Sequence, residues 1–138
     1  MTTSFRLLVV LLISTYGFSA CAQQVKSDSA VSSPRIVYTV VDRPPAFTGG
    51  SSELNWYLRK NLRYPEAARK ARLEGRVFVS FIVNDQGGIE DVHVLNSLNR
   101  EMDAEAVRLV QEMPTWIPGK QNGKPVNCRF NLPVIFIL

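Results

Sequence analysis

The fold is decided by the stretch Val77-Phe78-Val79-Ser80-Phe81-Ile82-Val83, which the turn Asn84-Asp85-Gln86-Gly87-Gly88 joins to a second apolar run ending at Leu95. Six of the seven residues in the first run are β-branched or aromatic, as is typical of a strand. Every second residue from Val77 to Val83 shares one face, and the other face is apolar enough to be partly covered. Adjacent glycines after Asn84 suit a tight turn. The sequence therefore predicts a β-hairpin over 75–95.

The second arm of this hairpin has an irregular pattern. Val92 and Val94 share one face, but Ile89 is out of phase with them. Either a β-bulge lies between Ile89 and Val92, or Ile89 belongs to the end of the turn.

A helix and a last strand follow the hairpin. Apolar residues at helical spacing lie at Ala106, Leu109, Val110 and Met113, with Asp103 as the expected N-cap and Pro114 as the stop. Residues 116–125 are rich in turn formers and are expected to be a connector. The last strand is predicted over 127–138, with one apolar face formed by Cys128, Phe130, Leu132, Val134, Phe136 and Leu138.

Connection rules place the last strand at the edge of the sheet. A hairpin followed by a crossover helix gives an antiparallel sheet in the order second arm, first arm, last strand. Pro133 agrees, because a proline lacks the N–H donor that a central strand needs. Its outward direction should be shared by Arg129, Asn131 and Ile135. Their unpaired backbone groups would be a template for an incoming strand.

Two helices are expected before the hairpin. The first begins near Ser51 or Ser52, either of which can cap it, and carries an apolar stripe at Leu54, Tyr57, Leu58 and Leu62. The second runs from Pro65 to Arg72 and has a small face of Ala67, Ala68 and Ala71. Further upstream, residues 36–41 form either a short strand or an extended arm that ends at Pro44-Pro45.

The N-terminus has the layout of a secretory signal over residues 1–20: Arg6, an apolar run from Leu7 to Ile13, and small residues before Cys21. The apolar run is shorter than the ~20 residues that span a bilayer. Phe18-Ser19-Ala20-Cys21 resembles the lipobox of bacterial lipoproteins, which implies that Cys21 is lipidated and anchors the chain to a membrane. A conventional cleavage near Ala20 or Ala22 is the alternative. Residues 21–45 are expected to be a flexible tether, and residues 46–138 a folded domain.

Composition excludes several classes of function. Net charge is +4, and the basic residues gather between Arg59 and Arg76. They form either a solvated helix face or a surface that attracts anionic partners. No stacking aromatics accompany them, so we expect no nucleic-acid partner. Cys128 is expected to be a small buried residue without a disulfide.

No enzymatic site is expected. His93 is the only histidine in the chain, so neither a histidine-based metal cluster nor a Ser/His/Asp arrangement can form within one chain. We expect His93 at the surface, and no catalytic residue, cofactor or metal. Trp116 is expected to close the core rather than contact a partner, whereas Tyr64 is left open between these two roles.

Several fragments together resemble one family, the C-terminal domain of TonB. They are Tyr64-Pro65 with Ala67-Ala68, Glu74-Gly75-Arg76-Val77, Asp85-Gln86-Gly87-Gly88-Ile89, Met102-Asp103-Ala104-Glu105-Ala106, Trp116-Ile117-Pro118-Gly119-Lys120 and Leu132-Pro133-Val134. The resemblance covers residues 46–138 and predicts an α+β fold. That fold has a three-stranded antiparallel sheet of hairpin and C-terminal edge strand, with the preceding helices packed on it.

The resemblance implies a periplasmic module of TonB-dependent transport. Its last strand would pair with the TonB box of an outer-membrane receptor. That role maps onto the rim residues Asn127, Arg129, Asn131, Ile135 and Ile137, and onto Tyr64-Pro65. The Ala22 after Cys21 favours the outer membrane for the anchor.

The resemblance also leaves alternatives open. The chain lacks the membrane-spanning helix and the long Pro-rich spacer of full-length TonB, so energy transduction by this chain alone does not follow. A structural envelope lipoprotein that binds another envelope protein or cell-wall glycan is the alternative function. A homodimer through the exposed edge is a further possibility.

Overall fold

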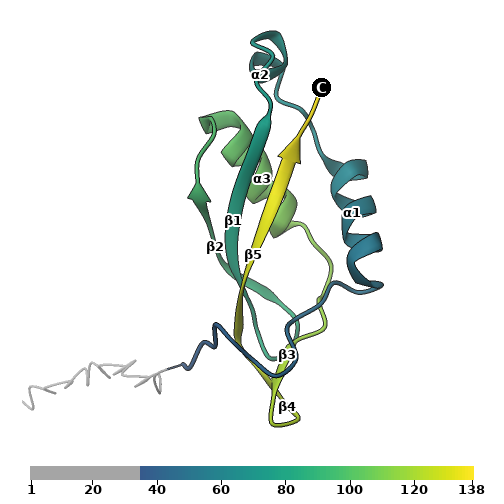
Figure 1. Cartoon of the computed structure of the whole chain (residues 1–138), viewed down its shortest axis with the longest axis vertical. Helices are drawn as coiled ribbons and strands as arrows, with labels where there is room; N and C mark the ends of the chain where they lie inside the picture. The colour runs from purple at the N-terminus through teal and green to yellow at the C-terminus, as the bar shows by residue number, and fades with distance from the viewer. Residues whose placement is uncertain (1–34) are drawn as a thin grey trace, which may run out of the picture. The chain divides into compact units, whose positions relative to one another are not determined.

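Three antiparallel strands form the main sheet in the order β2-β1-β5, in a computed structural model that describes residues 35–138. The strands are β1 (Gly75–Val83), β2 (Ile89–Asn96) and β5 (Cys128–Phe136). The predicted hairpin and the edge position of the last strand are both confirmed (Figure 1). The expected signal peptide and Cys21 lie outside the described residues.

The alternation in β1 separates the two faces of the sheet as predicted. Val77, Val79, Phe81 and Val83 are fully buried in the core. On the opposite face, Ser80 and Ile82 are also buried. The expectation that this second face is partly covered is therefore confirmed.

A bulge in β2 explains the phase of Ile89. Ser80 pairs with His93 and Ile82 pairs with Glu90, so β2 carries one more residue than β1 over this interval. Asp91 has a positive φ of 50° there. Because the extra residue resets the alternation, Ile89, Val92 and Val94 all pack against the core.

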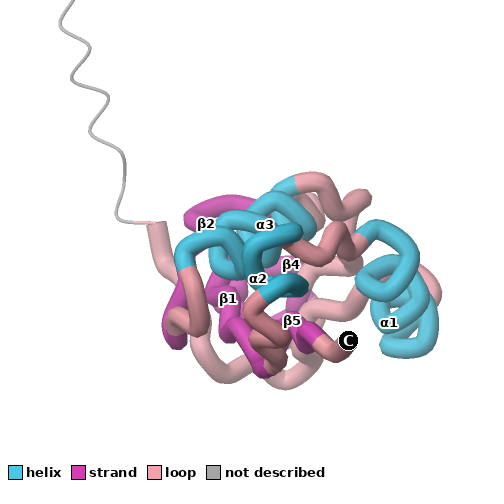
Figure 2. The backbone as a smooth tube through the Cα atoms, turned by 90° about the horizontal axis from the view of Figure 1, so that it is seen from above, coloured by secondary structure: helices cyan, strands magenta, loops and turns pink. Residues whose placement is uncertain are grey.

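Helix α3 (Arg100–Gln111) covers one face of the sheet, and α1 (Gly50–Asn61) lies beyond the free edge of β5 (Figures 1 and 2). The apolar stripe of α3 is buried as predicted, at Ala106, Leu109 and Val110. The stripe of α1 also faces the core, with Leu54 buried and the others packed against it.

The predicted helix caps were wrong. Asn99 caps α3, because its side chain accepts hydrogen bonds from the N–H groups of Glu101 and Met102. Asp103 instead accepts from Leu98 N–H, before the helix. The residue before α1 is Gly49, and no side chain caps that helix.

The short helix α2 (Glu66–Lys70) begins one residue later than expected, after Pro65. Only Ala68 of its three alanines is buried; Ala67 and Ala71 are exposed, so the predicted small packing face was wrong in part. Leu138 was also expected on the apolar face of the last strand. It lies past the end of β5 and is 54% exposed.

The connector after α3 contains a second hairpin that the sequence did not reveal. Strands β3 (Gly119–Gln121) and β4 (Lys124–Val126) pair across the two residues Asn122-Gly123, both with positive φ. Asn-Gly is a strong signal for a two-residue hairpin turn. The two strands are only three residues long and contain Pro125 and two lysines, so they lack the apolar alternation that predicts a strand.

The segment Arg35–Ala46, called the arm below, lies against the domain. Tyr38 pairs with Cys128, Arg43 with Lys120 and Ala46 with Ile117. These pairs join the arm to β3, to β5 and to the segment that follows α3. Tyr38 makes an isolated bridge rather than a ladder, which decides in favour of an extended arm.

An aromatic cluster around Trp116 forms part of the core. Trp116 is 2% exposed, and its ring lies 5.6 Å from Phe47, 5.4 Å from Phe81 and 5.2 Å from Phe130. Its expected place in the core is confirmed.

Candidate functional site: the free edge of β5

The outward direction of β5 is fixed by one hydrogen bond. Arg129 N–H donates to Tyr38 O of the arm at 2.9 Å, on the side away from β1. Because backbone groups alternate in direction along an antiparallel strand, Asn131, Pro133 and Ile135 also aim outward. Among the described residues, no hydrogen bond reaches the N–H groups of Asn131 and Ile135 from that side.

The arm occupies the first part of this edge. Tyr38 N–H donates to Asn127 O at 2.9 Å, in addition to the bond that Tyr38 O accepts. The C=O group of Asn127 and the N–H group of Arg129 are therefore already paired. The open edge runs from Asn131 to Ile137.

The side chains of Asn127 and Arg129 are also engaged within the molecule. Arg129 donates to Ser80 Oγ at 3.1 Å and to Asp91 Oδ2 at 2.7 Å, across the outer face of the sheet. The hydrogen bond from Arg129 holds the pKa of the Asp91 carboxyl below its usual range. Asn127 Oδ1 accepts from Arg35 and from Asp85 N–H.

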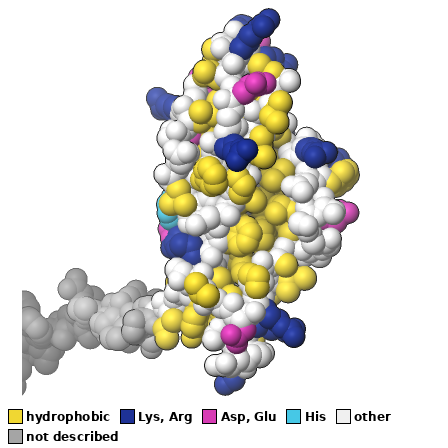
Figure 3. Space-filling model, viewed as in Figure 1, with side chains coloured by type: hydrophobic (Ala, Val, Ile, Leu, Met, Phe, Trp, Pro, Cys, Tyr) yellow, Lys and Arg dark blue, Asp and Glu magenta, His cyan; other side chains and the backbone are white. Residues whose placement is uncertain are grey.

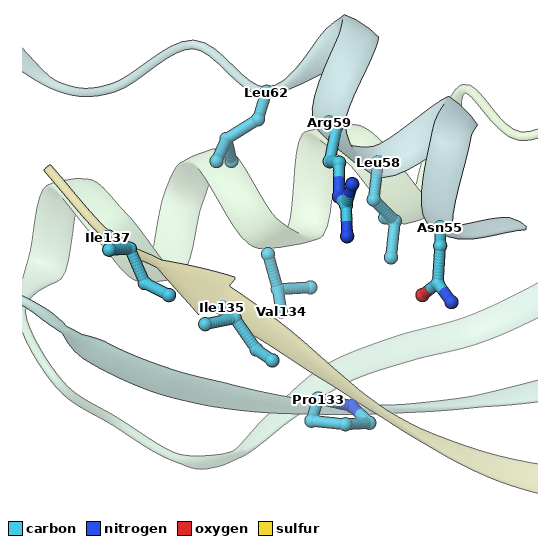
Figure 4. Close-up of a pocket in the computed structure, with 8 residues that line it drawn as sticks. All are labelled: Asn55, Leu58, Arg59, Leu62, Pro133, Val134, Ile135 and Ile137. Carbon is cyan, nitrogen blue, oxygen red and sulfur yellow. The ribbon is translucent and has the colours of Figure 1, made fainter.

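A groove of about 480 Å³ lies between the open edge and α1. Its lining comes from one face of α1 with its C-cap Leu62, and from the end of β5 with Ile137 just beyond it: Asn55, Leu58, Arg59, Leu62, Pro133, Val134, Ile135 and Ile137. Figure 4 shows the α1 side chains pointing toward β5. Hydrophobic side chains follow this strip on the surface (Figure 3).

Exposed apolar side chains and one cation give the groove its chemistry. Ile135 is 48% exposed and Ile137 is 71% exposed, and both stand beside Leu58 and Leu62 at the groove. Contiguous exposed apolar surface of this kind marks a binding site for a partner. Arg59 is the one charged residue in the lining, so the groove is apolar with a positive wall.

Tyr64 and Pro65 lie outside this groove. The Tyr64 ring packs edge-on against Phe136 at 5.7 Å, and its hydroxyl donates to Leu73 O. Pro65 is the N-cap of α2. The structure thus shows a packing role for Tyr64, and contact of this pair with a partner stays a prediction.

Asn55, Leu58, Arg59 and Leu62 are groove residues that sequence reasoning did not assign to the site. The helical stripe placed Leu58 and Leu62 on the core side of α1, which is correct for the part that packs inward. The missing information was the location of α1 beside β5, which depends on tertiary packing.

Within residues 35–138, no three His, Cys, Asp or Glu side chains are grouped to hold a metal ion. Cys128 is buried, as predicted, and burial raises the pKa of its thiol. His93 is exposed, as predicted. No helix of the described part is long and apolar enough to span a bilayer.

The fold and the site together define a class: small α+β domains in which the C-terminal strand keeps one free edge beside a helix. The sequence profile described as Gram-negative bacterial TonB protein C-terminal matches residues 60–138. The chain belongs to this family, and residues 60–138 are a TonB-type C-terminal domain.

Two solved structures are similar to the chain, both NMR solution structures of the Helicobacter pylori TonB C-terminal domain. One is 20% identical, with 63% of this chain and 78% of that chain covered and a TM-score of 0.47. The other is 20% identical, with 62% and 90% covered and a TM-score of 0.47. No curated protein matches this sequence.

Proposed function

We propose that this protein is a non-enzymatic, periplasmic binding module of TonB-dependent transport. The open edge of β5, from Asn131 to Ile137, takes a short segment of an outer-membrane receptor, the TonB box, as a fourth strand. The observation that carries the proposal is the outward row of unpaired backbone groups on β5, beside an apolar groove. Family membership supports the same role.

Backbone pairing supplies the affinity in this mode of recognition. Asn131 and Ile135 each offer an N–H and a C=O, whereas Pro133 offers only a C=O. Each hydrogen bond formed contributes roughly 0.5–1.5 kcal/mol net. A guest of about seven residues can therefore be held by a few such bonds plus burial of its side chains.

The groove defines which side chains the guest should carry. Alternate guest side chains on the α1 side would meet Leu58 and Leu62, so apolar residues are favoured there. Arg59 favours an acidic residue nearby and disfavours a basic one.

A titration of the labelled protein with a TonB-box peptide tests the proposal. We expect the amide NMR signals of Asn131 and Ile135 to shift most, with smaller shifts at Leu58 and Arg59. A scrambled peptide of the same composition is the control. Shifts confined to β2, or no shift with any box peptide, would contradict the placement.

Ile135→Pro gives a sharper test, because it deletes one outward N–H donor. The fold should tolerate it, since proline is accepted at the outward positions of an edge strand. We expect the affinity for the peptide to fall about threefold to tenfold, which corresponds to the loss of one hydrogen bond. Ile135→Val keeps the N–H and should bind nearly as the wild type. Equal affinity of both variants would refute strand pairing at this residue.

The anchor and location belong to the same proposal. A lipid on Cys21 would hold the domain at a membrane of the envelope, with the outer membrane favoured, and intact mass of the mature protein from membranes would reveal the acyl groups. Photo-crosslinking from Ile135 in whole cells identifies the partner. Capture of transport receptors supports the module, whereas capture of another envelope protein or cell-wall glycan would favour the structural lipoprotein instead.

A further inference from the structure

We propose that the arm, Arg35–Ala46, is a built-in stop that limits how far a guest strand can extend along β5. This inference rests on the proposed function and adds a determinant of register and length to the same edge. The arm pairs in parallel with the start of β5 through Tyr38 and uses the C=O of Asn127 and the N–H of Arg129. Those are the groups that a longer guest would need.

The arm is held on both sides of Tyr38. Upstream, Arg35 forms an ion pair with Glu90 at 2.6 Å and donates to Asn127 Oδ1 at 3.1 Å. The hydrogen bonds from Arg35 and Asn84 lower the pKa of Glu90, so this carboxylate stays charged at neutral pH. The upstream end is thus fixed by side chains to β2 and to the start of β5.

Downstream, the arm is fixed by backbone pairing. Arg43 and Lys120 exchange two hydrogen bonds at 3.1 and 2.8 Å, and Ala46 and Ile117 exchange two at 3.0 and 2.8 Å. Pro45 is buried between these pairs. A guest strand would have to break contacts at both ends to displace the arm.

The arm leaves the edge directly after Tyr38. Val40 is 84% exposed, and within residues 35–138 no hydrogen bond joins residues 39–41 to β5. The edge from Asn131 onward therefore stays open. The arm occupies one end of the edge and leaves the groove beside α1 accessible, as a stop should.

Binding of peptides of increasing length to the full-length protein tests whether the arm limits the guest strand. The probes are a five-residue TonB-box peptide and versions lengthened by two or four residues at either end. Tyr38→Pro removes the N–H that donates to Asn127 O. Val40→Pro is the matched control at an exposed residue of the same arm. Binding is measured by calorimetry, and amide hydrogen exchange reports on Arg129.

In the wild type, we expect lengthening toward the arm to leave the affinity unchanged, and Arg129 N–H to stay protected when peptide is bound. In Tyr38→Pro, the same lengthening should raise the affinity about threefold to tenfold, because Asn127 C=O has lost its donor and the weakened bridge holds Arg129 N–H less firmly. Arg129 N–H should exchange faster in the free variant. Val40→Pro should behave as the wild type.

The outcomes separate this inference from the proposed function. Binding of the short peptide with equal gains from lengthening in the wild type and Tyr38→Pro would overturn the stop alone. Loss of protection at Tyr38 and Arg43 on peptide binding would also overturn it, because the arm would then be displaced. Absence of binding by any peptide to either protein would overturn the proposed function and the stop with it.

Discussion

At the scale of single residues, Gly87 links the hairpin turn to the segment after α3. Trp116 N–H donates to Gly87 O at 2.9 Å. A Cβ atom at Gly87 would lie 2.0 Å from Trp116 O, and its φ is +86°. Both the backbone conformation and the close approach therefore require glycine at this position.

We expect Gly87→Ala to lower the free energy of unfolding by clearly more than Gly123→Ala. Gly123 also has a positive φ, of +75°, but a Cβ atom there would meet nothing within 4 Å, so alanine should cost only the roughly 1–2 kcal/mol of a left-handed conformation. Alanine at Gly87 adds a collision with backbone. Urea unfolding of both variants measures the difference, and equal losses would contradict the tight contact.

The sequence predicts the turn at Gly87 but not the contact between this turn and Trp116. Asn-Asp-Gln-Gly-Gly between two apolar runs is sufficient to predict a hairpin. The approach of Trp116 is a contact between residues far apart in the chain, and no local pattern encodes it. Similarly, Ser51 and Asp103 are good capping residues, yet Gly49 and Asn99 are the N-caps. Asn is as favourable an N-cap as Asp, so residue preference alone does not distinguish Asn99 from Asp103.

At the scale of secondary-structure elements, α1 turns a free strand edge into a groove. Arg59 from α1 is the charged residue of its lining. Lys60, the next residue, lies over the Trp56 ring at 4.4 Å and is not part of the lining. The two neighbours therefore carry the same charge in different surroundings.

Arg59→Glu should reverse the charge preference of the groove, whereas Lys60→Glu should not. We expect the wild type to bind a box peptide with one Asp about twofold to fivefold more tightly than the same peptide with Lys, which is the scale of an exposed ion pair. Calorimetry at low and high salt measures this preference, which should weaken with salt. The same response in both variants would show that net charge, rather than the groove, decides.

The edge position of β5 was predictable from the sequence, because Pro133 and the hairpin–helix–strand order both require it. The groove was not predictable, since it needs the location of α1. The occupied start of the edge was not predictable either. Asn127 and Arg129 fit the outward pattern, but the pairing of Tyr38 with this end of β5 joins segments far apart in sequence.

At the scale of the whole molecule, one ion-pair network ties α1 to α3. Arg108 donates to both carboxylate oxygens of Glu105, at 2.8 and 2.6 Å, and to Asn61 O at 2.9 Å. Arg63 N–H donates to Glu105 Oε1 at 2.7 Å. Burial alone would raise the pKa of Glu105, but the hydrogen bonds from Arg108 and Arg63 outweigh it and lower the pKa.

A carboxyl whose pKa is lower in the folded state stabilises the fold above its unfolded value of 4.5 and loses this contribution as the pH falls further. We therefore expect the free energy of unfolding to decrease on acidification below about pH 4.5, with a smaller slope in Glu105→Gln. Urea unfolding between pH 3 and 7 measures the slope. Glu101→Gln, an exposed change on the same helix, is the control, and an unchanged slope in Glu105→Gln would exclude this network as a source.

Pro133 has a consequence for how molecules meet one another. If the β5 edges of two copies paired with Pro133 opposite Pro133, each proline would face a carbonyl of the other copy. Because proline has no N–H, it could not donate a hydrogen bond to that carbonyl. Such a pairing is weakened at its centre, so the interruption disfavours sheet growth from copy to copy. Pro133 thus weakens edge-to-edge association of two copies in this register while leaving the edge open to a guest of another sequence.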